Sequence, residues 1–139
     1  MHVKTDSLRI PTKGDCDIVD ITGRLNEIIS RHNFTNGSAT VFVAGSTAGL
    51  TTIEYEPGLR KDLPEVFERI APQNHRYHHD ATWHDGNGHA HVRASLLGPS
   101  IVLPFSEGGL MVGTWQQVVV VDFDNRPRTR NIIVQLMGE

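Results

Sequence analysis

The chain has 139 residues, a net charge of −3 and a pI near 6.2, with 38 % hydrophobic and 21 % charged residues. This length and composition are typical of one globular domain, residues 1–139, with a buried core. The small negative charge gives no general attraction to nucleic acid or to an anionic membrane, so neither is expected as a partner. No stretch approaches the roughly 18 apolar residues of a membrane span.

The single cysteine, Cys16, excludes an intrachain disulfide, and residues 1–10 contain no apolar core of a secretory signal. Both features favour a cytoplasmic protein. Cys16 lies between Asp15 and Asp17, whose carboxylates disfavour a thiolate. We therefore do not expect Cys16 to act as a nucleophile.

Apolar periodicity predicts an α+β fold, a small single-domain β-sandwich of about seven strands with two helices. The expected strands are 3–10, 39–44, 50–55, 100–105, 110–113, 117–123 and 131–137. The first helix follows from an apolar stripe between Ile21 and Ile29, with Asp20 or Thr22 as its cap. The second helix is expected to begin at Asp62 and to end before Pro72, and one or two further helical turns are possible at 94–97.

The strand at 117–123 is apolar on both faces, from Val118 to Val121. Such a strand must be covered twice. We expect one cover from its own domain and the other from something else, which favours an oligomer.

Histidines are concentrated between residues 75 and 91, where six of the eight in the chain lie. They are His75, His78, His79, His84, His89 and His91. Imidazole is the commonest protein ligand for zinc and related ions. The cluster therefore predicts a metal site or a catalytic site with several imidazoles, and the alternative is a solvated polar loop.

Within this cluster, His89 and His91 project to one side only if the backbone is extended, since on a helix they would point about 200° apart. His79 lies upstream, in a segment that is interpreted as a neighbouring strand. Three imidazoles with one open position are the pattern of catalytic zinc. We therefore expect His79, His89 and His91 to bind a divalent metal, zinc first, with His79 and His91 also catalytic.

Three further positions carry candidate chemistry. Glu54 could bind the metal or act as general base on a metal-bound water, and the alternative is a solvated strand end. Ser46 and Thr47 lie in a turn whose hydroxyl and N–H groups suit an anion or phosphate, or in an ordinary strand connection.

Arg128 and Arg130 share one face if the last strand continues through them, and they could then hold a phosphate. Such a run is more often a solvated edge that discourages strand pairing. Thr114 and Gln116 could line a pocket.

Several of these motifs together resemble the YjbQ family, often described as secondary thiamine-phosphate synthases. The similarity rests on residues 46–51, Glu54, residues 79–80, residues 85–91, residues 97–100, residues 113–117 and the Arg-rich last strand with residues 138–139. It implies a small α+β sandwich that assembles into a homotrimer, with polar pockets near the subunit boundaries and a metal or anion held by histidine. The implied reaction joins a pyrimidine diphosphate to a thiazole phosphate and releases pyrophosphate.

The sequence departs from that family at two places. Many members have a histidine where this chain has Gly45, so His89 is expected to replace the missing imidazole. Many also have Asn-Glu-Asn where this chain has Ile53-Glu54-Tyr55, which keeps only the carboxylate.

Three functions follow from these residues. The first is a metal-dependent enzyme acting on a small phosphorylated compound, with thiamine-phosphate synthesis as the family description. The second is a metal-assisted hydrolase of a small molecule. The third is a non-catalytic trimer that binds a metal or anion.

Overall fold

The computed structural model describes residues 1–139 and contains eight strands and four helices. The strands are β1 (His2–Thr12), β2 (Asp17–Asp20), β3 (Gly37–Ala44), β4 (Ala48–Ile53), β5 (Ser100–Ser106), β6 (Gly109–Leu110), β7 (Gln117–Asp122) and β8 (Arg128–Gly138). The helices are α1 (Thr22–Arg31), α2 (Leu59–Ile70), α3 (His78–Trp83) and α4 (Gly88–Leu97). The α+β class that the periodicity predicts is confirmed.

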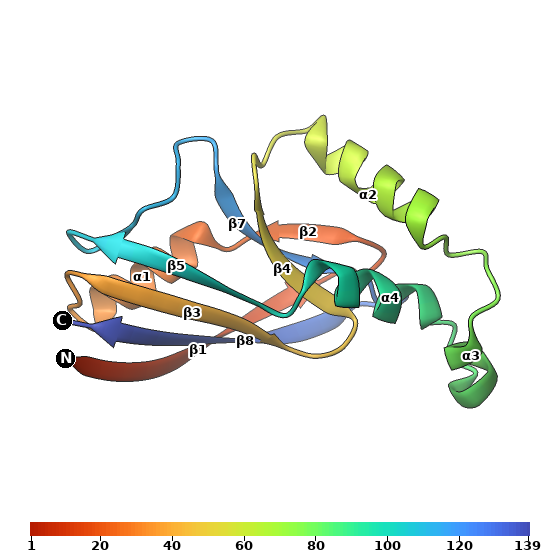
Figure 1. The fold of residues 1–139 in the computed structure, drawn as a ribbon, viewed down its shortest axis with the longest axis horizontal. Coiled ribbons are helices and arrows are strands. Elements are labelled where there is room, and N and C mark those ends of the chain that lie inside the picture. Colours follow the sequence, from red (N-terminus) through yellow and green to blue (C-terminus); the bar gives the residue numbers. More distant parts are fainter.

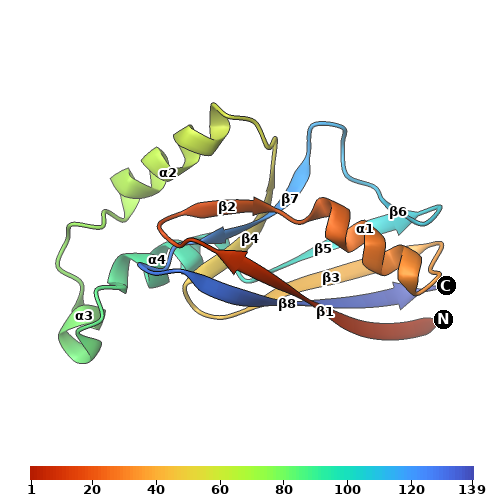
Figure 2. The ribbon, with the colours of Figure 1, turned by 180° about the vertical axis from the view of Figure 1, so that it is seen from behind.

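All strands pair antiparallel in two sheets, one in the order β1-β8-β3-β5-β6 and one in the order β2-β7-β4. The smaller sheet packs over one part of the larger sheet, and α1 lies over the part near the two chain ends (Figures 1 and 2). Helices α2, α3 and α4 lie at the opposite end of the molecule from the termini (Figure 1). None of the four helices is long and apolar enough to cross a membrane.

Strand β7 is buried on both faces, as its sequence predicts, but both covers come from the same chain. Val118 and Val120 lie in the main core with the larger sheet and α1, whereas Val119 and Val121 lie in a second cluster with residues of α2 and α4. The second cluster includes an edge-to-face contact of Phe67 on Phe123, with ring centroids 4.8 Å apart. The expectation that something outside the domain covers this strand is therefore wrong.

Local hydrogen bonds decide where the first two helices begin. Helix α1 begins at Thr22 because the Asp20 carboxylate accepts hydrogen bonds from the backbone N–H (2.9 Å) and the hydroxyl (2.7 Å) of Thr22. Helix α2 begins at Leu59 and not at Asp62, because the Glu56 carboxylate accepts from the N–H groups of Gly58 and Leu59. These carboxylates satisfy N–H groups that a helix start leaves free.

The histidine segment forms a helix, a short turn and a second helix, so the expected extended backbone is wrong at His79 and at His89–His91 alike. The carboxylate of Asp80 in α3 accepts a hydrogen bond from the N–H of Gly88 at 3.0 Å and so caps the start of α4. A Cβ on Gly88 would lie 2.3 Å from Cβ of Tyr77, so only glycine permits this close approach. These contacts bring α3 against the first turn of α4.

Candidate metal centre

His79, Asp85 and His91 form the group of side chains best suited to a metal ion. Their ligand atoms all lie within 4.8 Å of one another. The rings of His79 and His91 are 4.1 Å apart between centroids, and Nε2 of His79 is 3.4 Å from the Asp85 carboxylate. Ligands on one tetrahedral zinc lie roughly 3.3 Å apart, given Zn–N and Zn–O bonds of about 2.0–2.1 Å. Small side-chain rotations would therefore seat an ion and leave its fourth position open.

The protonation of this group suits a metal. Burial, and then the neighbouring His79, lower the pKa of His91, which favours the neutral ring that a metal ligand must have. A hydrogen bond from the backbone N–H of Asn87 lowers the pKa of Asp85, which favours its carboxylate form. Both shifts reduce the competition between protons and a cation.

The turn that carries Asp85 has a defined shape. His84 and Gly86 both take left-handed backbone angles, with φ of 55° and 69°, which reverse the chain between α3 and α4. Asp85 Oδ1 accepts from the N–H of Asn87 at 3.1 Å, and its carbonyl accepts from the Asn125 side chain at 2.8 Å. A ligand held by its own hydrogen bonds is oriented before the metal arrives.

His89 does not join this group, which corrects the expected set of three imidazoles. Because residues 89–91 are helical, His89 points away from His91, and it is 2 % exposed on the side of α4 that faces α2. Burial, and then Arg93, lower the pKa of His89. His89 also does not replace the imidazole missing at Gly45, since the two residues line different cavities.

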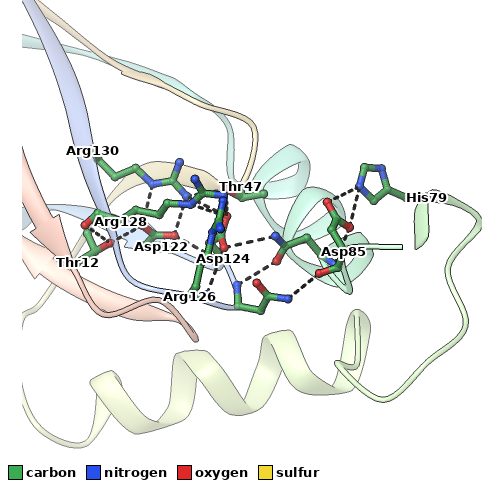
Figure 3. A network of polar contacts seen from close by, with 11 residues as sticks. Thr12, Thr47, His79, Asp85, Asp122, Asp124, Arg126, Arg128 and Arg130 are labelled. Atoms are coloured by element: carbon green, nitrogen blue, oxygen red, sulfur yellow. Dashed lines mark hydrogen bonds and ion pairs between the residues drawn. The ribbon is translucent and has the colours of Figure 1, made fainter. Parts of the chain in front are cut away.

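We call His79, Asp85 and His91 the metal group. A buried network of charges lies beside it, around the turn between β7 and β8 (Figure 3). Asp122 and Asp124 are 0 % exposed. Arg130 donates to both oxygens of Asp122, at 2.7 and 2.8 Å, and to the Thr47 hydroxyl at 2.6 Å. Thr47 in turn donates to Asp124 at 2.9 Å. Thr47 and Arg130 thus hold the interior of this turn together.

Asp124 is the centre of that network. Burial alone would raise its pKa, but hydrogen bonds from Thr47, Arg128 and Asn87 outweigh burial and lower it. The last of these bonds, from Asn87 Nδ2, is 3.3 Å long. Asn87 also accepts a 2.9 Å bond from the N–H of Asn125 through its Oδ1. Asn87 therefore ties the Asp85 turn to the buried carboxylates.

A small cavity of about 180 Å³ lies between the turn that joins β3 to β4 and the C-terminal half of α4. Ser46, which is exposed, lines it together with Gly45 and with Ser95, which follows His91 by one helical turn. Nη1 of Arg130 makes no hydrogen bond within the chain and faces Gly45. Arg128, with its side chain 37 % exposed, donates to Asp124 and also keeps a free Nη1. These groups could meet an anion.

Glu54, Thr114 and Gln116 lie elsewhere. Glu54 is exposed and follows the end of β4, whereas Thr47 precedes the start of that strand. The six residues of β4 separate the two ends by about 20 Å, at about 3.3 Å per residue. Gln116 donates to the Thr52 hydroxyl at 3.0 Å, so it and Thr114 belong to the Glu54 end. Within a single chain, Glu54, Thr114 and Gln116 therefore lie far from the histidines.

Asp85, Asn87, Asp122 and Asp124 are the residues at this site that sequence reasoning missed. The Asp-Gly-Asn-Gly run was visible beside the histidines, and its carboxylate was an available signal. Asp122 and Asp124 follow four consecutive valines, and charges at the end of a doubly buried strand need partners. The sequence could therefore have predicted Arg128 and Arg130 as the partners of these carboxylates.

Known proteins share both the sequence and the shape of this chain. Residues 6–139 match the family described as "UPF0047 protein YjbQ-like". A UPF0047 protein from Archaeoglobus fulgidus is 35 % identical over 130 residues, which is 94 % of this chain and 98 % of the relative. A second, from Methanothermobacter thermautotrophicus, is 32 % identical over 139 residues, 100 % of this chain and 95 % of the relative.

Solved structures agree. A YbjQ-like protein of unknown function from Sulfolobus solfataricus superposes with a TM-score of 0.89 at 33 % identity, covering 99 % of this chain and 100 % of that one. A YjbQ/UPF0047 protein from Clostridium acetobutylicum gives a TM-score of 0.83 at 31 % identity, covering 96 % and 99 %. The similarity extends over nearly the whole chain in sequence and in fold, and the chain belongs to the YjbQ-like UPF0047 family.

Proposed function

We propose that this protein is an enzyme that uses a divalent metal to act on a small phosphorylated compound, with zinc as the first candidate for the metal. The observation that carries the proposal is the convergence of His79, Asp85 and His91 within 4.8 Å. Two imidazoles and one carboxylate with an open position are a ligand set of catalytic zinc. Bound there, the ion would activate a water or polarise a phosphate oxygen.

The cavity at Ser46 supports a phosphorylated substrate, since Ser95 in its lining follows His91 by one helical turn. Ser46 in its lining offers a hydroxyl, and Nη1 of Arg130, which faces Gly45 of the same lining, has no hydrogen-bond partner within the chain. Guanidinium and hydroxyl groups are suited to phosphate oxygens. At about 180 Å³ the cavity holds a phosphoryl group and a few further atoms, and the rest of the substrate would extend outward.

A general base must come from a neighbouring subunit if Glu54 is to take part, because Glu54 lies about 20 Å along β4 from Thr47 in its own chain. We therefore propose a cytoplasmic homotrimer in which the Glu54 end of one subunit meets the histidine end of the next. The outer face of the larger sheet supports association, since four apolar side chains are exposed on it: Val3 (54 %), Phe42 (40 %), Val102 (64 %) and Met137 (41 %).

The specific reaction that the resemblance in sequence implies is thiamine-phosphate synthesis. The same residues fit a metal-assisted hydrolase of a small phosphorylated or acyl compound. The separation of Glu54 from the histidines favours a further candidate, a trimer that binds metal or anion without catalysis.

The first experiment measures metal. Untagged protein is analysed for bound transition metals, stripped with a chelator and titrated with zinc, alongside His79→Ala, His91→Ala and the control His75→Ala, whose ring is exposed outside the group. We expect one zinc per chain, lost in the first two variants and kept in the control. Equal zinc binding in all four proteins would overturn the site.

The second experiment separates the functions. The zinc-loaded protein is assayed for joining a pyrimidine diphosphate to a thiazole phosphate, with pyrophosphate as the readout, and for hydrolysis of each compound alone. Loss of activity in Glu54→Gln, restored when it is mixed with His91→Ala and reassembled, would support catalysis across subunits. Metal binding without turnover of any compound would favour the non-catalytic trimer.

A further inference from the structure

A second cavity, of about 260 Å³, lies on the side of α4 opposite His91, between α2, α4 and the turn that joins β1 to β2. Its lining includes Asp15, Cys16, Glu65, Glu68, His89 and Arg93. The candidate metal centre uses none of these residues. The cavity is smaller than the range of about 300–1,000 Å³ that is common for drug-sized ligands, so an occupant would be a compact molecule.

His89 points into this cavity without a partner. The residue is 2 % exposed, yet neither ring nitrogen makes a hydrogen bond within the chain. Every fully enclosed side-chain nitrogen or oxygen of the protein does have a partner. The ring nitrogens of His89 must therefore retain contact with the cavity, and a buried polar group without a partner is costly unless something meets it.

The charges around His89 are unbalanced. Arg93 is already committed, because it donates to the carbonyl of Ala71 at 2.9 Å and to Glu68 at 2.7 Å. Glu68 also accepts from the N–H of Gln73 at 3.1 Å. Asp15 and Glu65 form no ion pair and no side-chain hydrogen bond. The cavity thus presents two free carboxylates at its rim and a free imidazole within, which favours a cation over an anion.

A metal ion does not fit this arrangement. His79, Asp85 and His91 are the one place in the chain where three such ligand atoms lie within 4.8 Å of one another. The donors around His89 are spread over the cavity and suit an extended group with several N–H donors. The thiol of Cys16 is also a poor ligand, because burial raises its pKa to about 11.

We propose that this cavity is a binding site for a small organic cation, an amidinium, guanidinium or primary ammonium compound. The cation donates to the His89 ring and is held by Asp15 and Glu65. The backbone at its edge is strained, with left-handed φ of 52° at Asp15 and 66° at Cys16, and such strain clusters at ligand sites. The proposal is independent of the metal centre.

The test uses two probes of one shape, butylguanidinium and its neutral analogue butylurea, titrated into metal-stripped protein by calorimetry and by the Nε–H resonance of Arg93. We expect saturable binding of butylguanidinium at least about tenfold tighter than that of butylurea, the equivalent of about 1.4 kcal/mol. Glu65→Gln should weaken it about two- to fivefold. His89→Phe, which keeps the ring but removes its nitrogens, should weaken it about tenfold.

Two matched controls locate the effect. Glu27→Gln removes an exposed carboxylate from α1, and His91→Ala removes the imidazole on the other side of α4; both should bind the probe like the wild type. If His89→Phe does not fold, the affinity of Glu65→Gln for butylguanidinium tests the proposed site on its own. Equal affinity for the two probes, no saturable binding, preference for inorganic phosphate, or unchanged binding in Glu65→Gln would each overturn the proposal.

Discussion

Asp85 and Asp124 are carboxylates joined through one residue, Asn87, yet they differ in how far their oxygens are satisfied. Asp124 is 0 % exposed and accepts hydrogen bonds from Thr47, Asn87 and Arg128. Asp85 has a side chain that is 42 % exposed and meets only His79 and a backbone N–H. The saturated carboxylate has no capacity left for a ligand, whereas the open one does. Residual hydrogen-bonding capacity, more than residue type, separates the structural part of this region from the part suited to bind.

The largest effect is expected for Asp122→Asn, inside the saturated network. The change removes a charge that Arg130 meets at two oxygens and leaves the 7 %-exposed guanidinium without its main partner. Breaking a buried pair in this way costs about 3–5 kcal/mol of unfolding free energy, measurable by urea denaturation. Asp6→Asn is the control, because Asp6 pairs with Arg31 and His32 near the surface and should cost only about 0–1 kcal/mol. Equal losses in the two variants would contradict the assignment of Asp122 to structure.

Gly88→Ala should have the next largest effect, because it acts where the two parts join. A new Cβ would lie 2.3 Å from Cβ of Tyr77 and would push α3 from the start of α4. Such overpacking costs about 1–3 kcal/mol, and we expect zinc affinity to fall with it. Gly23→Ala in α1 is the control: nothing lies within 4 Å of its Cβ, so it should be neutral or stabilising by up to about 1 kcal/mol. Wild-type stability and zinc binding in Gly88→Ala would show that this close approach is not required.

Asp85→Asn should change stability least among the three substitutions at this site. The side chain is exposed and its amide oxygen can still accept from Asn87, so we expect a loss within about 1 kcal/mol. Zinc affinity should fall at least about tenfold, since we propose the Asp85 carboxylate as a ligand. A large loss of stability with unchanged zinc affinity would reverse the comparison with Asp122.

The residues that could be predicted from the sequence are those whose signal is local. The valines of β7 identified a doubly buried strand, and Asp20 and Thr22 identified the start of α1. The histidines indicated the candidate site, because six histidines within 17 residues are a local feature of the sequence. The choice of Asp85 as the third candidate ligand required the helical backbone of α4, which no apolar stripe in the sequence predicts: three of its first four residues are Gly88, His89 and His91.

The other contacts of the candidate site could not be predicted, because they depend on long-range strand pairing. Asp122 and Thr47 meet only because Ala48 pairs with Asp122 across β4 and β7, and the partner of Arg130 depends on where the β7–β8 turn closes. The same register pairs Ile53 with Gln117, so Glu54 lies just past that end of β4 and away from the histidines. Sequence spacing cannot give these distances, because they are set by pairing between β4 and β7, whose paired residues are 64 to 74 positions apart in the chain.

The smallest expected effect is the change of the free energy of unfolding with pH. Burial lowers the pKa of both His89 and His91 below the ordinary value of 6.5, so the unfolded chain binds protons more readily than the folded chain in this range. Stability contributed by the neutral rings is complete above pH 6.5 and is lost as the pH falls through and below that value. In metal-free protein, the free energy of unfolding should therefore decrease between about pH 7 and pH 5, and His89→Phe should reduce that decrease. The two histidines can be compared directly, since zinc should suppress the contribution of His91 and leave that of His89 unchanged. A slope that zinc alters equally in the wild type and in His91→Ala would contradict the division of α4 into a metal-binding side and a separate cavity.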